Sequence, residues 1–179
     1  MADFPGIDPI AKALVDRFGM TPLPVEATFF AQTYRSAAST GDAPAGTAGV
    51  GLYSVDPPSR SLFHRLAYDE IWHFYAGDPL RLVLLHPDGS DEEVVLGDAV
   101  EGHAVQHVIP AGTWQAGETA PGGAWSFFGV TMAPGFTAAC FEGGRAADLI
   151  ASHPARAADI ERLSIPVGEP ASMPEGFEN

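Results

Sequence analysis

The chain has 179 residues, of which 46% are hydrophobic, so it is long enough for one domain with a buried core. Its formal net charge of −14, from 9 basic and 23 acidic residues, disfavours binding to nucleic acids and to anionic membrane surfaces. No stretch is long and apolar enough to cross a membrane, and the first residues lack the basic and apolar segments of a signal peptide. We therefore expect a soluble, cytoplasmic protein without nucleic-acid or membrane partners, and an anionic small substrate stays compatible because a single buried arginine can hold it.

A short N-terminal helix is predicted over about residues 9–18. Asp8 is suited to cap the first turn, Pro9 fits the first helical position, and Gly19 is a typical stop. Between these residues the segment IAKALVDRF carries apolar side chains at helical spacing.

Between about residues 27 and 132 the chain alternates short β-rich runs with clusters of Gly, Pro and Asp. The runs are ATFFAQTYRS, VGLYSV, LFHRL, EIWHFYAG, LRLVLLH, EEVVLG, AVQHVIP and WSFFGVTM. Turns such as HPDGS and APGGA separate them, and this pattern predicts an all-β antiparallel sandwich or barrel rather than alternating strands and helices. The segment SAASTGDAPAGTAG, residues 36–49, is predicted to be a flexible loop.

The C-terminal part of the chain changes to a helical pattern. Residues 144–163 predict a helical segment that breaks at Pro154, and residues 165–179 predict a loosely ordered tail. We interpret residues 1–179 as one domain whose core spans about residues 23–142. The single cysteine, Cys140, excludes an internal disulfide and is predicted to be a small buried side chain.

Two polar residues interrupt the most aromatic stretch, SLFHRLAYDEIWHFYAGDPLRL. His64 lies on one predicted strand, and strand alternation places Glu70, Trp72 and Phe74 on one face of the next. A carboxylate among aromatic side chains either finds a partner or has its pKa raised by loss of solvation, and a raised pKa suits a general acid or base. Glu70 and His64 are therefore candidate catalytic residues. The alternative is a structural pair held by hydrogen bonds beneath a turn.

Other polar and aromatic residues are candidates for substrate binding. Glu26 and Arg35 can form a structural ion pair, or act as a base and an anion clamp. An amide at Gln115, after the PAGTWQ turn, can orient a substrate or cap a strand. Aromatic side chains are core by default, although a small barrel can line a ligand cavity with them. The aromatic candidates are Tyr34, Trp72, Phe74 and Trp114.

Four blocks of sequence form a recognisable set: SLFHRLAYDEIWHFYAGDPLRLVLLHPDG, VIPAGTWQAGE, VTMAPGF and TYRS. Together they resemble the cupin superfamily, specifically its DUF985 or Cupin_5 branch, over about residues 23–153. The resemblance implies a jelly-roll β-barrel, the double-stranded β-helix, here with a short N-terminal helix and a C-terminal helical segment. Members of this branch usually pair through their β-sheets, so the resemblance also implies a homodimer.

The resemblance also concerns metal binding. The usual cupin motif has two histidines separated by one residue, then a glutamate and a glycine, with a third histidine in a second motif. His64, Glu70 and Gly77 match, whereas Leu66 replaces the second histidine and Gln115 replaces the third. A catalytic metal normally needs about three good protein ligands. The resemblance therefore implies either no required cofactor or a divalent metal held weakly by His64, Glu70 and Gln115.

The segment before the first long strand departs from the branch. Where relatives resemble HPEGGYFRETYRS, this chain reads PVEATFFAQTYRS. Glu26, Tyr34 and Arg35 are retained, while Ala27 and Thr28 replace glycines. These changes lie where the pocket mouth is expected, so the substrate is expected to differ from that of ordinary relatives.

Three functions are compatible with this set of residues. The first is an enzyme that moves protons on a small organic molecule, as an isomerase, epimerase, cyclase or lyase does, with Glu70 as base or acid and His64 as its partner. The residues that orient an oxygen-rich substrate or exclude water are then Arg35, Gln115, Trp72, Phe74 and Trp114. The second is a metal-dependent cupin oxygenase or isomerase. The third is a small-ligand binding protein without catalysis, and the fold alone does not separate the three.

Overall fold

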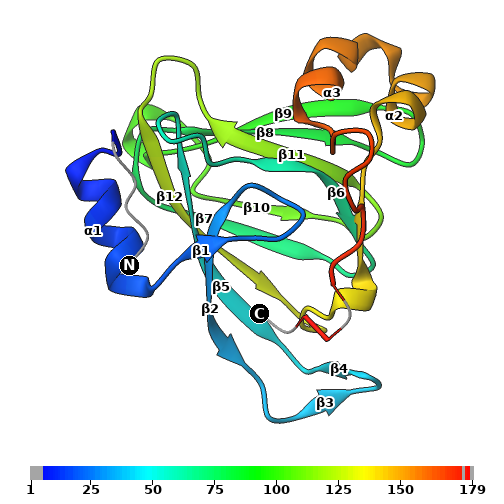
Figure 1. The fold of residues 1–179 in the computed structure, drawn as a ribbon, viewed down its shortest axis with the longest axis horizontal. Coiled ribbons are helices and arrows are strands. Elements are labelled where there is room, and N and C mark those ends of the chain that lie inside the picture. The colour runs from blue at the N-terminus through cyan, green and yellow to red at the C-terminus, as the bar shows by residue number, and fades with distance from the viewer. Residues whose placement is uncertain (1–5, 175, 178–179) are drawn as a thin grey trace.

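The computed structural model describes residues 6–174 and 176–177, which form two facing antiparallel sheets (Figure 1). One sheet has the order β1 (Thr21–Pro22), β2 (Phe29–Arg35), β5 (Thr47–Ser54), β12 (Trp125–Met132), β7 (Glu70–Gly77) and β10 (Gln106–Ile109). The other has the order β13 (Phe141–Gly143), β6 (Ser61–Leu66), β11 (Trp114–Thr119), β8 (Leu80–Leu85) and β9 (Asp91–Leu96). This is the jelly-roll architecture that the sequence predicts.

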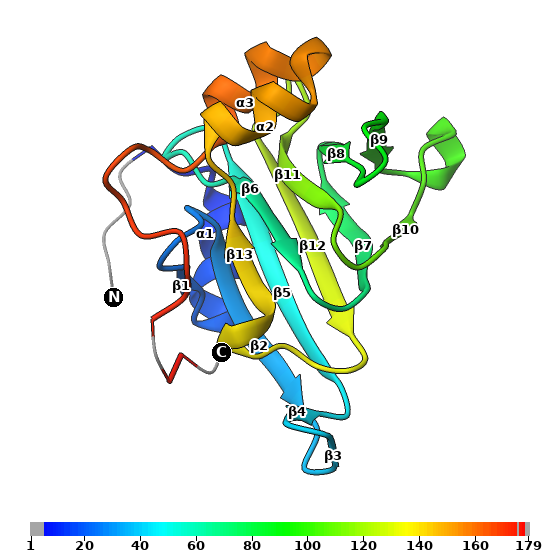
Figure 2. The same ribbon diagram turned by 90° about the vertical axis from the view of Figure 1, so that its right-hand side faces the viewer.

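Helix α1 (Pro9–Phe18) packs on the outer face of the six-stranded sheet (Figure 2). Asp8 caps its first turn by accepting two backbone hydrogen bonds, and Gly19 ends the helix with φ of 63°. Ala11 and Val15 are buried against side chains of β2, β5 and β12. The predicted bounds and both end signals are confirmed.

Strand alternation gives each sheet an inner and an outer face. The inward rings of Tyr53 on β5, Trp72 on β7 and Phe128 on β12 pack together, with the Trp72 and Phe128 centroids 4.7 Å apart. They meet inward leucines of β8 from the opposite sheet. This core fills the barrel as far as Trp72 and Phe128, and a cavity lies on the other side of these two rings.

Two helices cover the outer face of the five-stranded sheet (Figures 1 and 2). They are α2 (Ala146–Ser152) and α3 (Ala157–Leu163), and the chain breaks between them at Pro154, as predicted. Leu149 and Leu163 are buried against β6 and β8. Single 3₁₀ turns occur at Ala99–Glu101, Ala138–Cys140 and Pro154–Arg156. Among the described residues, the helices are all too short or too polar to cross a bilayer.

Several strands were not predicted, including the short edge strands β1 and β13. Strand β11 pairs with both β6 and β8, but its small residues Ala116 and Gly117 have little β-propensity, so the sequence pattern does not mark it. Residues 36–49, predicted as a loop, contain a hairpin of β3 (Ser39–Thr40) and β4 (Ala43–Pro44) and the first residues of β5.

The C-terminal tail also differs from the prediction of loose order. Ile165 and Met173 are buried, and Ala171 accepts a hydrogen bond from the backbone of Gly143. Arg145 donates hydrogen bonds to tail carbonyls, which fastens the segment along β13. Residues 175, 178 and 179 of the predicted tail lie outside the described residues. The tail was misjudged because its contacts are with distant strands, which its own composition does not reveal.

Three arginines join the outer helix layer to the five-stranded sheet, namely Arg81, Arg156 and Arg162. Arg81 on β8 donates two hydrogen bonds to Asp159 on α3, at 2.9 and 2.8 Å, and one to Glu93 on β9 at 2.9 Å. Its guanidinium also lies 3.3 Å from Glu118 on β11. These hydrogen bonds lower the pKa of Asp159 and of Glu93, because they stabilise the ionised carboxylates.

We expect Arg81→Met to lower the free energy of unfolding by about 1 to 2 kcal/mol, because three carboxylates lose a largely buried partner while Arg156 and Arg162 still pair with them. Lys12→Met is the matched control, since Lys12 makes one exposed ion pair on α1 and its loss should cost less than about 0.5 kcal/mol. Urea denaturation measures both. Equal losses in the two variants would contradict the role given to Arg81.

Candidate functional site

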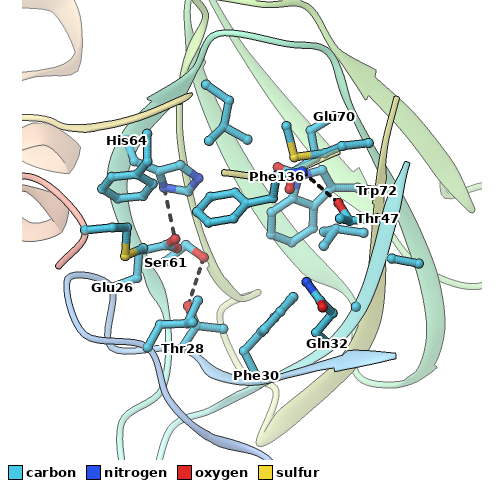
Figure 3. A pocket seen from close by; sticks show the side chains of 18 of the residues that line it. Glu26, Thr28, Phe30, Gln32, Thr47, Ser61, His64, Glu70, Trp72 and Phe136 are labelled. Atoms are coloured by element: carbon cyan, nitrogen blue, oxygen red, sulfur yellow. Dashed lines mark hydrogen bonds and ion pairs between the residues drawn. The ribbon is translucent and has the colours of Figure 1, made fainter. Parts of the chain in front are cut away.

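A cavity of about 70 Å³ lies between the sheets at the end opposite the filled core (Figure 3). Its wall is mostly apolar and includes six aromatic residues: Phe30, Trp72, Phe128, Phe136, Phe141 and Phe177. The polar side chains in the wall are those of Glu26, Thr28, Gln32, Thr47, Ser61, His64 and Glu70. A small apolar pocket with a few convergent polar groups is the usual form of a ligand site.

Glu70 is the first residue of β7 and points into the barrel. Its Oε2 accepts hydrogen bonds from Gln115 Nε2 and from Trp72 Nε1, both at 2.9 Å. Trp72 Nε1 also lies 3.0 Å from Gln115 Oε1, so the three side chains form a closed set. All three are buried. The set fixes one carboxylate oxygen and leaves Oε1 without a hydrogen bond from any described residue.

Burial raises the pKa of Glu70, because the ionised carboxylate loses its hydration in the barrel. The charge of His64 and the hydrogen bonds from Gln115 and Trp72 lower this pKa, and the charge of Glu26 raises it. The loss of hydration is the largest effect, so the protonated acid persists to a higher pH than for an exposed glutamate. Glu70 is therefore suited to exchange a proton with a bound molecule.

His64 on β6 lies beside a second buried carboxylate. Its Nδ1 is 2.8 Å from the Leu62 carbonyl and 3.5 Å from Glu26 Oε2, and its ring stacks on Phe141. A carbonyl only accepts hydrogen bonds, so Nδ1 carries the proton. In the neutral ring Nε2 is then an acceptor, and it makes no hydrogen bond within the described chain. Figure 3 shows His64 and Glu26 on the same side of the cavity.

Arg35 holds a wall segment and does not itself line the cavity. It ends β2, and its Nη1 donates a hydrogen bond of 3.2 Å to the carbonyl of Phe136, whose ring is part of the wall. The backbone N–H of Phe136 donates to Thr47 Oγ1 at 2.9 Å. Arg35 thus positions the connection that follows β12, whereas the sequence assigned it to substrate binding.

Three aromatic residues predicted to bind substrate or exclude water do not line the cavity. Trp114 directly precedes the inward Gln115, so alternation turns it outward, where it lies 4.7 Å from the guanidinium of Arg65. An irregularity in β2 after Gln32 turns Tyr34 outward, and it is 57% exposed. Phe74 faces inward but packs in the filled core.

A chain of three hydroxyl groups beside the cavity was missed. Tyr53 donates to Ser61 Oγ at 2.8 Å, the Ser61 and Thr28 hydroxyls are 3.0 Å apart, and Thr28 donates to the Arg60 carbonyl at 3.0 Å. Burial raises the pKa of Tyr53 well above its usual value, so its hydroxyl stays protonated. A register shift between β6 and β11 separates Ser61 from His64, and strict alternation therefore did not place both on the inner face.

The residues do not fit a resident divalent metal. Leu66, which takes the place of a histidine, contributes an apolar wall, and the Gln115 amide uses both its atoms on Glu70 and Trp72. Among the described residues, no three His, Cys, Asp or Glu side chains converge closely enough to hold a metal ion. The ligand set predicted from the cupin resemblance, His64, Glu70 and Gln115, is gathered at one place, but the Gln115 amide is committed to Glu70 and Trp72. His64 Nε2 and Glu70 Oε1 are then the two open ligands of the set, fewer than the three that a catalytic metal normally needs.

Comparison with solved structures shows where this fold recurs. A hypothetical protein from Leishmania major has a TM-score of 0.78 and 26% identity, covering 87% of this chain and 99% of its own. A protein from Shewanella oneidensis has a TM-score of 0.77 and 28% identity, covering 87% and 98%. A cupin 2 conserved barrel domain protein from Rhodopseudomonas palustris shares the fold, with a TM-score of 0.52, 17% identity, and coverage of 76% and 80%.

None of the curated proteins matches the chain. The family described as "Cupin superfamily (DUF985)" matches residues 12–143, which include both sheets and every polar residue of the cavity wall. The chain therefore belongs to this family of the cupin superfamily.

Proposed function

We propose that this protein is an enzyme that transfers protons on a small organic molecule bound in the barrel cavity. One observation carries the proposal: Glu70, a buried carboxyl group with a raised pKa, has Oε2 fixed by Gln115 and Trp72 and Oε1 without a hydrogen bond from the described residues. A positioned acid with a shifted pKa is the requirement for general acid–base catalysis.

In this proposal Glu70 Oε1 takes a proton from a carbon next to a carbonyl group and returns it to the substrate. His64 Nε2 is the second proton acceptor, and the ring becomes an imidazolium that Glu26 stabilises from Nδ1. The aromatic wall keeps bulk water out, which strengthens these electrostatic interactions. Epimerisation, tautomerisation, cyclisation and elimination all use such a step, so the proposal covers isomerase, epimerase, cyclase and lyase activities.

Two alternative functions lead to different observations. A metal-dependent oxygenase or isomerase should retain about one equivalent of a transition metal, which His64→Ala should remove. A binding protein should bind its ligand without any chemical change. The homodimer expected from the resemblance stays a prediction, which the molar mass in solution will test.

Glu70→Gln should reduce proton transfer by about 10²- to 10⁴-fold, because an amide cannot exchange the proton. Gln fits the site, since its carbonyl oxygen can accept from both Gln115 and Trp72 in place of Oε2. The measurement is deuterium uptake from D₂O next to the carbonyl of small aldehydes and ketones, followed by NMR.

The matched control is Glu142→Gln, which changes an exposed glutamate of β13 that pairs with Arg65. This variant should exchange deuterium at the wild-type rate. Wild-type exchange in Glu70→Gln would overturn the role of Glu70. A bound ligand that exchanges no deuterium in the wild type would favour the binding protein.

The raised pKa of Glu70 also predicts a pH dependence of stability. Between the ordinary value of 4.5 and the raised pKa, the unfolded chain loses this proton while the folded chain keeps it. Glu70 therefore makes the fold less stable as pH rises through that interval, and Glu70→Gln removes the loss. The melting temperature of the variant minus that of the wild type should increase as pH rises above 4.5. A difference that does not change with pH would contradict the raised pKa.

A further inference from the structure

The part of the cavity wall formed by Glu26, His64 and Glu70 presents atoms that accept hydrogen bonds, while the donors of the wall are on Gln32 and Thr47. Glu70 Oε1 has no donor among the described residues, and Glu26 contributes a second buried carboxylate, paired with His64 Nδ1 at 3.5 Å. His64 Nε2 is a further acceptor in the neutral ring, because Nδ1 holds the proton. Glu26, His64 and Glu70 are each less than one-tenth exposed. A ligand that contacts this side of the cavity meets lone pairs.

The hydroxyl chain adds acceptors and not donors. Thr28 uses its proton on the Arg60 carbonyl, so Ser61 donates to Thr28 and Tyr53 donates to Ser61. Each of the three protons is thereby used within the protein. Ser61 and Thr28, which line the cavity, have only oxygen lone pairs left for a ligand.

The charges around the cavity also favour a positively charged ligand. None of the described lining residues is a lysine or an arginine, while two lining residues are buried carboxylic acids. The negative charge of Glu26 raises the pKa of Glu70. The rings of Phe30, Trp72 and Phe136 also form part of the wall, and aromatic faces attract cations.

We propose that the ligand of this cavity is a small organic cation with N–H donors, that is, a protonated amine. Its N–H groups satisfy acceptors that the protein leaves open, and its charge compensates the buried acids. An anion is repelled by Glu26 and Glu70, and a neutral alcohol brings one donor and no charge. The inference rests on the proposed function in that it names the substrate class for the same site, a compound that carries a protonated amine besides its carbonyl group.

Four probes of similar size separate the possibilities: n-butylamine, n-butanol, butyrate and tetramethylammonium. Dissociation constants are measured near neutral pH by titration calorimetry or ligand-observed NMR on the intact protein. We expect n-butylamine to bind at least tenfold more tightly than n-butanol, and butyrate not to bind. Tetramethylammonium, a cation without N–H groups, should fall between the amine and the alcohol.

Charge-neutral variants test which residues create the preference. Glu26→Gln and Glu70→Gln should each reduce the ratio of butanol to butylamine dissociation constants by about tenfold, which corresponds to about 1.4 kcal/mol. Glu142→Gln should keep the wild-type ratio. The inference is overturned if n-butanol or butyrate binds as well as n-butylamine, or if both cavity variants keep the preference.

Binding is measured without turnover, so failure here is distinguishable from failure of the proposed function. An amine preference together with normal deuterium exchange in Glu70→Gln supports the ligand class and removes the acid–base role. A preference for n-butanol or butyrate, with exchange lost in Glu70→Gln, removes the ligand class and supports the acid–base role of Glu70.

Discussion

The contact of Glu70 with Gln115 and Trp72 is the interaction on which the site depends. It joins the two sheets across the barrel, since Glu70 and Trp72 belong to β7 in one sheet and Gln115 to β11 in the other. A buried carboxylate is costly unless hydrogen bonds compensate it. The bonds to Oε2 offset part of this cost, and the remainder is expressed as the raised pKa that suits Glu70 to carry a proton.

Two segments far apart in sequence close the cavity at the end away from the core. The connection after β12 brings Phe136, held by Arg35 and Thr47, and the C-terminal tail brings Met173 and Phe177. The tail is fastened by backbone and arginine hydrogen bonds along β13. Arg35 lies near the site without lining it, because its Nη1 donates a hydrogen bond to the carbonyl of Phe136 in the wall. The cavity wall thereby keeps its acidic character.

The local sequence pattern was sufficient to predict part of the fold and part of the site. Period-two alternation placed Glu70 and Trp72 on one face of their strand, which the structure shows to be the inner face, and the caps at Asp8 and Gly19 marked α1. The predictions that failed depended on strand register or on contacts between residues far apart in sequence. The irregularity in β2 turned Tyr34 outward, and the tail gained its order from strands that precede it by many residues. Neither a bulge nor a long-range contact can be read from the period of hydrophobic residues.

The replacements at the usual cupin metal positions alter the charge balance of the site. In the superfamily motif that this sequence resembles, histidines and a glutamate surround a cation. Here Leu66 and Gln115 replace two of the histidines, while Glu70 stays and Glu26 lies close by. A site that keeps its acids but loses metal ligands must balance the negative charge in another way. A positively charged ligand does this and favours the ionised form of Glu70, whose pKa burial raises, so ligand binding is coupled to release of a proton from Glu70.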